Sequence, residues 1–354
     1  DTPSNDSILP EKELEELDKA MAKAEMYHAR ACRPLDSLLK IAADTARPVA
    51  ERSGILSKVA HAYSVMDADT AFKIANDAIR LASLAGNDSL MLAARIARVS
   101  ALTSGGLFNN AEKEFIEIEA GDLPPKQKEI LWQVGRQMYA YMALYAEGNF
   151  EISEKLRRRA MQYDDSLLSI LPDSLMFRNF IVAERLVSDG NYEHARLTLD
   201  SLMKDHRNDS RISSMAAYQL ALVSKNTGKE RDYVAYMATA ATGDIHNGVR
   251  EGLALFNLAN WLYHQGEVTT AFRYINFAMR EAMNGKARMR AVNIASMLPM
   301  IDEQYRISNK KSHDHLTFLS VILCFLLFAL GVFVAILVWQ RRRREAAQKK
   351  LTEL

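Results

Sequence analysis

The sequence predicts an all-α fold, in which a solenoid of helical hairpins is followed by one transmembrane helix. Glycine and proline, which interrupt helices, are scarce, with 15 and 8 among 354 residues, and no proline lies between Asp173 and Leu298. A helix–turn–helix pattern recurs along residues 51–285, and residues 316–339 contain no charged residue.

The recurring pattern is clearest in two segments, VAERLVSDGNYEHARLTLDSLM (182–203) and LANWLYHQGEVTTAFRYINFAM (258–279). Each has an apolar residue followed by Ala, a turn Gly, and a second Ala five residues after that Gly. Weaker copies in the same frame predict helix breaks at Met66, Gly106, Gly148, Gly190, Gly228 and Gly266. The spacings between these turns are 40, 42, 42, 38 and 38 residues. Each hairpin is too small to bury its own apolar face, so we expect the hairpins to stack on one another.

This frame resembles the tetratricopeptide repeat (TPR), whose standard unit is about 34 residues, so the copies here have longer helices or loops. The resemblance implies TPR-like repeats over residues 51–285. Residues 1–10 are expected to form a flexible tail. Residues 11–50 are expected to form capping helices, a hairpin in which Pro34 fits the turn.

Residues 316–339 are 24 uncharged, mainly apolar residues, and about 20 suffice to cross a membrane as a helix. The fifteen residues before this segment contain three Lys or Arg, and the fifteen after it contain six. Positive residues stay on the cytoplasmic side. The membrane boundary is therefore placed at Trp339 and the residues Arg341, Arg342, Arg343 and Arg344.

This orientation puts the N-terminal body outside the cytoplasm, which in a bacterium means the periplasm, with the chain anchored in the inner membrane. The sequence begins DTPSNDS, without Met or an apolar leader, and we expect a signal peptide to have been removed. Residues 340–354 are expected to begin a cytoplasmic coiled coil, as a helix continuous with the span.

Residues 286–315 are expected to form a linker helix with a kink at Pro299. Together with the basic spacer, the span and the charged helix, this segment resembles a family of bacterial membrane-anchored TPR regulators. The resemblance is carried by Arg288, Arg290, Ile294, Ala295, Leu298, Pro299, Ile301 and Tyr305. It covers residues 50–354 and implies a periplasmic array, one span, a coiled coil and a cytoplasmic output region, usually taken to be transcriptional, beyond Leu354.

First helices of TPR hairpins line a concave groove, and alignment on the turn positions predicts which side chains face it. The predicted groove residues are Met138, Met142, Tyr145, Phe180, Glu184, Tyr218, Phe256, Asn260 and Tyr263. This aromatic and Met-rich set suits an apolar peptide or another ligand. The alternative interpretation is that these residues pack between helices, which is common for aromatic residues at helical spacing.

Three further motifs each have a structural and a functional interpretation. His313 and His315 flank Asp314 in a possible metal or pH-sensing site, or in a polar spacer. The arginines at 157–159 fit a solvated helix face. Gly331 and Ala335 could allow close helix packing in a homodimer, supported by the coiled coil.

The composition excludes several classes of function. The net charge is +1, so nucleic-acid binding is not predicted, and the two cysteines rule out a disulfide framework or a zinc site built on cysteine pairs. No catalytic signature is present, so we expect no enzyme, cofactor or metal.

Two hypotheses remain. In the first, the array binds a peptide, saccharide, protein or other ligand and signals through the span. In the second, the chain is a membrane-tethered scaffold for envelope proteins that transmits no signal.

Overall fold

The structure is a computed structural model that describes residues 9–146, 148–205 and 211–352. Within these ranges it describes no side chain at 205, 308–309, 311–316, 329, 331–332, 335 or 343–352. The chain divides into two compact parts, residues 1–298 and residues 299–354, and each is described by itself.

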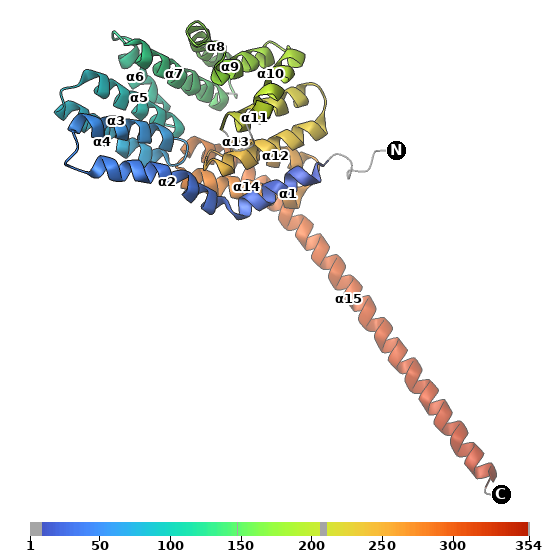
Figure 1. Cartoon of the computed structure of the whole chain (residues 1–354). Helices are drawn as coiled ribbons and strands as arrows, with labels where there is room; N and C mark the ends of the chain where they lie inside the picture. The colour runs from blue at the N-terminus through green and yellow to red at the C-terminus, as the bar shows by residue number, and fades with distance from the viewer. Residues whose placement is uncertain (1–8, 147, 206–210, 353–354) are drawn as a thin grey trace. The chain divides into compact units, whose positions relative to one another are not determined.

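The described residues form helices joined by short turns and contain no strand, which confirms the predicted all-α class (Figure 1). The helices are α1 (Glu11–Ala22), α2 (Ala24–Ala43), α3 (Val49–Tyr63), α4 (Ala68–Leu84), α5 (Asp88–Ser104), α6 (Phe108–Glu119), α7 (Pro125–Tyr145), α8 (Phe150–Leu168), α9 (Met176–Ser188), α10 (Tyr192–Asp205), α11 (Arg211–Asn226), α12 (Glu230–His246), α13 (Leu253–His264), α14 (Val268–Asn284) and α15 (Arg288–Thr352).

Six consecutive hairpins run from α3–α4 to α13–α14, and each predicted turn residue lies between the two helices of its hairpin. Four of the turn glycines have left-handed backbone, with φ of 76° at Gly106, 75° at Gly190, 71° at Gly228 and 85° at Gly266. This conformation is costly for residues with a Cβ atom, which explains why glycine recurs at the turn. The turn without glycine, at Met66, is followed by Asp67, whose carboxylate accepts a hydrogen bond from the Thr70 N–H and caps α4.

Small residues let the hairpins pack closely. In α4, Ala71, Ala75 and Ala78 are completely buried, so the neighbouring helices approach the α4 backbone. Gly135 in α7 has the same effect, because a Cβ atom there would lie 2.5 Å from the ring of Phe115. Close packing of the hairpins therefore requires small residues at the alanine and glycine positions of the repeat.

Helices α1 and α2 do not form the expected capping hairpin. Pro34 lies inside α2, and the helical conformation is instead interrupted at Lys23, between the two helices. Helix α1 packs on α12, whereas α2 packs on α12 and α3. The 20 residues of α2 span about 30 Å, which is long enough to join the last hairpins to the first.

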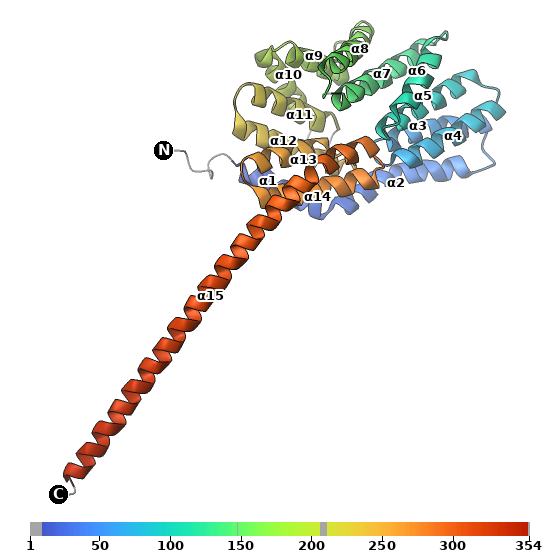
Figure 2. The same cartoon turned by 180° about the vertical axis from the view of Figure 1, so that it is seen from behind.

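The first part of the chain is consequently a closed array, visible from both sides in Figures 1 and 2. The Ala68 N–H donates to the carbonyl oxygen of Gly285 at 3.0 Å, and the Arg250 N–H donates to that of Val65 at 3.0 Å. Both bonds join the first hairpin to segments more than 180 residues later. The sequence predicted a stack of hairpins but not its closure.

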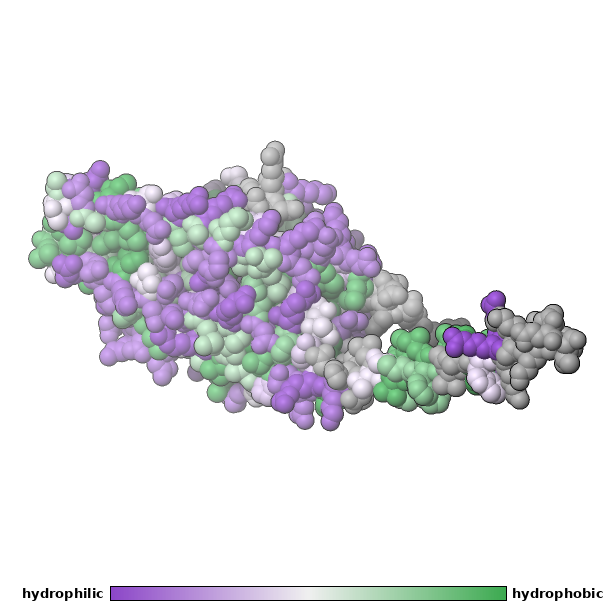
Figure 3. Space-filling view, turned by 90° about the horizontal axis from the view of Figure 1, so that it is seen from below, coloured by the Kyte–Doolittle hydropathy of each residue, from purple (hydrophilic) through white to green (hydrophobic). Residues whose placement is uncertain are grey.

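Helix α15 continues through Pro299 and from Gln340 to Thr352 without interruption, so the predicted continuity of the helix into residues 340–352 is confirmed. Its large apolar side chains between Phe318 and Trp339, where described, are exposed. Figure 3 shows them as a green segment followed by purple side chains. Within the described residues, none of the helices combines the length and the apolarity needed to cross a membrane. The span expected at 316–339 stays a prediction.

Candidate functional site

The predicted groove residues do not share one surface. Met138 is completely buried and Phe180 is 2% exposed, and each belongs to a hydrophobic core cluster. For these two residues the alternative interpretation, packing between helices, is the better one. Neither can contact a partner without local unfolding.

Glu184 and Tyr218 connect neighbouring first helices instead of facing an empty groove. Glu184 in α9 pairs with Arg136 in α7 and accepts a hydrogen bond from Gln219 Nε2 in α11 at 2.6 Å. Asn257 Nδ2 in α13 donates to the Tyr218 hydroxyl at 3.0 Å. A line of polar contacts thus runs across α7, α9, α11 and α13.

The other predicted groove residues are partly buried and lie in different surroundings. Met142 borders a hollow between α6, α7 and α8, whereas the Tyr145 ring lies 5.5 Å from the ring of Phe108. Phe256 and Tyr263 are half-buried, and the Tyr263 ring lies 5.5 Å from that of His264. Asn260 is also half-buried, and its side-chain oxygen lacks a hydrogen-bond partner.

The inner side of the closed array is instead occupied by a polar cluster that the sequence did not predict. Its centre is Glu251, in the loop between α12 and α13. The Tyr141 hydroxyl from α7 donates to both Glu251 oxygens, at 2.8 and 2.7 Å, and Gln137 Nε2 donates to the same hydroxyl at 3.3 Å. Arg211 Nη2 from α11 lies 3.9 Å from Glu251 Oε2.

The loop at residues 247–252 reaches this position because of its glycines. Gly248 and Gly252 have φ of 69° and 66°. A Cβ atom on Gly248 would lie 2.8 Å from the Cβ of Ala31, so glycine allows the loop to approach α2 closely. Arg250 and Glu251 are adjacent in this loop but contact different helices.

Arg250 ties the loop to the N-terminal and C-terminal helices. Its Nη2 lies 2.8 Å from a carboxylate oxygen of Glu25 in α2, and its Nε lies 3.4 Å from Glu281 Oε2 in α14. The side chains of Arg250 and Glu281 are each only 10% exposed. A buried pair of this kind fixes an arrangement, because removal of either partner leaves the other charge uncompensated.

The pKa values report the crowding on the inner side. Burial, partly offset by the positive charge of Arg211 and reinforced by Glu251, raises the pKa of Asp244 to about 7. Burial and the charge of Arg211 lower the pKa of His61, whose Nδ1 lies 3.1 Å from the Ser100 hydroxyl. The His61 side chain nevertheless remains accessible to solvent.

The first turn of α15 takes part in the same cluster. Arg290 is 3% exposed, and its guanidinium lies 5.4 Å from the centre of the Tyr145 ring. A cavity of about 10 Å³, room for one water molecule, lies between Arg290, Tyr141 and Glu251. Several buried polar atoms of the cluster lack a hydrogen-bond partner, namely Thr103 Oγ1, Ser104 Oγ, Arg211 Nη1 and Arg290 Nε.

Buried polar atoms are normally satisfied, so this partly satisfied cluster has unused capacity for hydrogen bonding to water or a ligand. In α7, alignment of the repeats on their turn positions predicted that Met138 and Met142 face the groove. The residues that face inward are Gln137 and Tyr141, each one position earlier. The two glycines around Arg250 and Glu251 were the only sequence signal for the loop.

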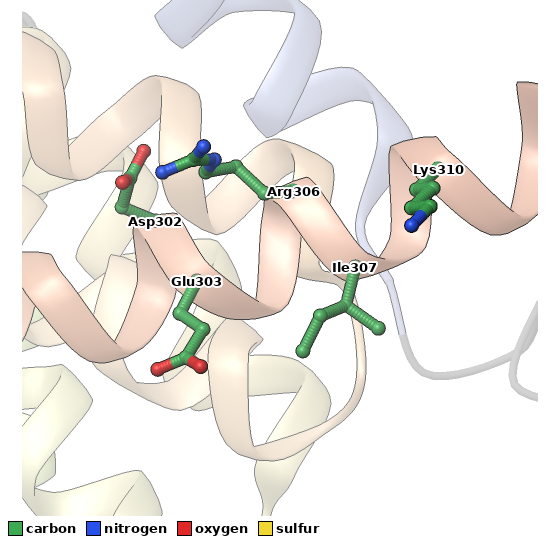
Figure 4. A pocket seen from close by; sticks show the side chains of 5 residues that line it. All are labelled: Asp302, Glu303, Arg306, Ile307 and Lys310. Atoms are coloured by element: carbon green, nitrogen blue, oxygen red, sulfur yellow. The ribbon is translucent and has the colours of Figure 1, made fainter.

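A second hollow is built by α15 alone (Figure 4). It is lined by Asp302, Glu303, Arg306, Ile307 and Lys310. These residues recur at the spacing of one helix face, and opposite charges such as Asp302 and Arg306 lie one turn apart. The face of a single helix does not surround a ligand, and we assign no site to it.

The remaining candidate motifs are outside these sites. Arg159 pairs with Glu119 at 3.2 Å, while Arg157 and Arg158 are exposed. The side chains of His313, Asp314 and His315, and those of Gly331 and Ala335, lie outside the described residues. Among the described residues, no group of His, Cys, Asp or Glu is arranged to hold a metal ion.

The comparison with protein families identifies the repeat. Residues 21–296 match the family described as the SusR N-terminal TPR domain, a range that runs from the end of α1 to the first turns of α15. TPR families bind peptides or proteins and are typically non-enzymatic. The search of curated proteins found no match.

Proposed function

The chain belongs to the SusR N-terminal TPR domain family, and from this premise we propose that it is a ligand-binding sensor whose output is carried by α15. The array binds a peptide, a protein segment or another polar ligand at the cluster around Glu251. Binding changes the position of the 247–252 loop, and the first turn of α15 responds.

The observation that carries this proposal is that the array and α15 share one incompletely satisfied polar cluster. Burial raises the pKa of Tyr145, while Arg290 from α15 lowers it and Glu251 from the loop raises it, so all three groups lie within electrostatic reach. Arg288, two residues before Arg290, pairs with Asp69 of the first hairpin at 2.7 Å. A change at Glu251 therefore acts on residues that hold α15.

A ligand can shift this arrangement only through unequal affinity for two states. The cavities beside the cluster are each about 10 Å³, so a ligand larger than water must displace the loop. A ligand that takes over the hydrogen bonds of Tyr141 and Arg211 would release Glu251. Release of Glu251 changes the polar surroundings of the buried Arg290, which lines the same small cavity, and this favours a different position of the first turn of α15.

For the remainder of the proposal, residues 316–339 cross the bacterial inner membrane and Arg341–Arg344 lie in the cytoplasm. The support is the uncharged sequence and the exposure of its described apolar side chains, which need an apolar surrounding. Residues 340–354 begin a coiled coil that leads to a transcriptional output region, and the chain forms a homodimer through Gly331 and Ala335 in the span and through this coiled coil. Single-cysteine labelling in intact cells tests this, and labelling of Lys350→Cys but not of the array would reverse the orientation. No feature of the array favours the tethered scaffold.

Hydrogen exchange tests the coupling between the cluster and α15. Glu251→Gln keeps the shape of the side chain but removes its charge, so amides at residues 288–298 should exchange about fivefold faster, as expected for a loss of about 1 kcal/mol. Glu184→Gln is the matched control, because Glu184 pairs with Arg136 and Gln219 and does not contact α15. Unchanged exchange at 288–298 in Glu251→Gln would contradict the proposal.

A further inference from the structure

A wide hollow lies between α6, α7 and α8, away from the polar cluster. Its volume is about 700 Å³, within the range of ordinary binding pockets. It is lined by Glu112, Tyr139, Met142, Ile152, Lys155, Leu156, Arg158, Arg159 and Gln162. Both α6 and α8 pack on α7, but among the described residues they make no extensive contact with each other. The two helices meet through Phe115 with Tyr163 and through Glu119 with Arg159, and the hollow lies beside these contacts.

The aromatic residue at the floor of the hollow is Tyr139, which is held by the aromatic core beneath it. Tyr139 and Tyr163 are stacked with their ring centres 5.9 Å apart, and Phe115 packs edge-on against both. The Arg159 guanidinium lies 5.8 Å from the centre of Tyr139, and Glu119 neutralises it at 3.2 Å. The floor is held in place by the core and needs no ordering when a partner binds.

The walls of the hollow carry exposed apolar side chains. Ile152 lines it and is 51% exposed. Ile116 is 50% exposed and lies one helical turn after Glu112 on the same face of α6, so the apolar surface continues beyond the lining residues. Exposed apolar surface beside a concavity is typical of an interaction site.

The charge around the hollow is positive. Lys155 and Arg158 are exposed on α8, and no described carboxylate forms an ion pair with either. Arg159 is compensated by Glu119, and Glu112 is the one acidic residue that lines the hollow. An occupant therefore has to present carboxylates to α8 and apolar side chains to the floor.

We propose that this hollow docks an acidic amphipathic helix of a partner protein. Leucine-like side chains at helical spacing enter between α6 and α8, and carboxylates on one edge of the helix face Lys155 and Arg158. A concave site with an aromatic floor suits a protruding helix better than a flat anionic membrane. This surface is separate from the Glu251 cluster, so the proposal does not depend on the sensor function.

A pair of synthetic peptides tests the proposal on the full chain by fluorescence anisotropy. One peptide of about five helical turns carries Leu at i, i+3, i+4 and i+7 with Glu elsewhere, and its counterpart carries Lys in place of every Glu. The acidic peptide should bind, and Lys155→Glu with Arg158→Glu should weaken its binding at least about tenfold at low salt. The same double variant should bind the Lys peptide more tightly than the wild-type chain does.

Arg157→Glu is the matched control, since Arg157 is exposed on α8 but does not line the hollow. It should retain nearly all affinity for the acidic peptide. Ile152→Asn should weaken the binding of both peptides, whatever their charge. Equal melting temperatures would show that the variants are folded.

Four outcomes overturn the proposal. The acidic peptide could fail to bind, or bind the double variant as well as the wild-type chain. Vesicles of anionic lipid could bind in its place with the same dependence on Lys155 and Arg158, which would assign the surface to a membrane. Concentration-dependent sedimentation that the double variant abolishes, without peptide binding, would assign it to a second copy of the chain.

Discussion

The middle of the array and its closure are held together by opposite means. Between α6 and α8 the contacts are aromatic, and Phe115, Tyr139 and Tyr163 are at most 4% exposed. At the closure the contacts are charged, with Arg250 between Glu25 and Glu281 and with Glu251 beneath Tyr141. The apolar contacts join neighbouring hairpins, whereas the contacts of Arg250 with Glu25 and of Tyr141 with Glu251 join residues more than 100 positions apart. Stability in the middle is therefore local, and stability at the closure depends on the whole array being in place.

The largest expected effect lies in the aromatic core. Phe115→Ala removes a completely buried ring and should lower the free energy of unfolding by about 4 kcal/mol, because the core around α7 cannot collapse onto the cavity. Denaturant unfolding measures the loss. Ile116→Ala, at the exposed neighbouring position, should change the free energy by less than about 1 kcal/mol. Equal losses in the two variants would mean that the middle of the array is not held by this core.

The same contrast explains how much the sequence could predict. Positions with the repeat period, such as Gly106 and Ala195, follow from local geometry and predict the turn and the close packing. Closure by α2 and the 247–252 loop depends on contacts such as Arg250 with Glu25, 225 residues apart, which have no periodic signal. Pro34 was misplaced for a related reason. Proline usually ends a helix, but here the helix continues because α2 packs on α3 and α12.

For the candidate site, the sequence predicted an aromatic and Met-rich groove along the first helices, but it did not identify the polar contacts that Gln137 and Tyr141 make. In α7 the inward-facing residues are Gln137 and Tyr141, one position before the predicted Met138 and Met142. A one-residue step turns a helical side chain by about 100°, which is the difference between the core and the inner surface. Apolarity alone could not distinguish these neighbours, because Tyr141 is also aromatic.

The second prediction concerns the buried charge pair. Arg250→Met should lower the free energy of unfolding by about 3 kcal/mol, because Glu281 stays buried without its partner. Burial already raises the pKa of Glu281, and Arg250 is the main group that opposes this. Adding Glu281→Met should recover most of the loss in a double-mutant cycle.

Glu25→Gln tests the exposed partner of Arg250, so its effect on stability can be compared with that of the buried partner, Glu281. The Glu25 side chain is 72% exposed, so this change should cost less than about 1 kcal/mol. If Arg250→Met and Glu25→Gln cost the same, the closure depends on surface charge and the contrast with the aromatic core fails.

The smallest expected effect depends on pH and concerns Asp244. Burial raises the pKa of this carboxyl group to about 7 in the folded chain, whereas in the unfolded chain it is near 4. The folded state therefore holds a proton that the unfolded state has lost, and this contribution disappears as the pH rises through 7. A shift of about three pKa units corresponds to about 4 kcal/mol at most, and the partial exposure of the Asp244 side chain reduces this. Asp244→Asn stays neutral, so at pH 8 the variant should be more stable than the wild-type chain by on the order of 2 kcal/mol. The difference should shrink towards zero below pH 4, where both wild-type states become protonated. Denaturant unfolding at several pH values measures it, and Asp189→Asn, at an exposed position, is the matched control. A difference that is constant between pH 4 and 8 would mean that Asp244 is solvated. The inner cluster around Glu251 and Arg211 would then be less crowded than the raised pKa of Asp244 indicates.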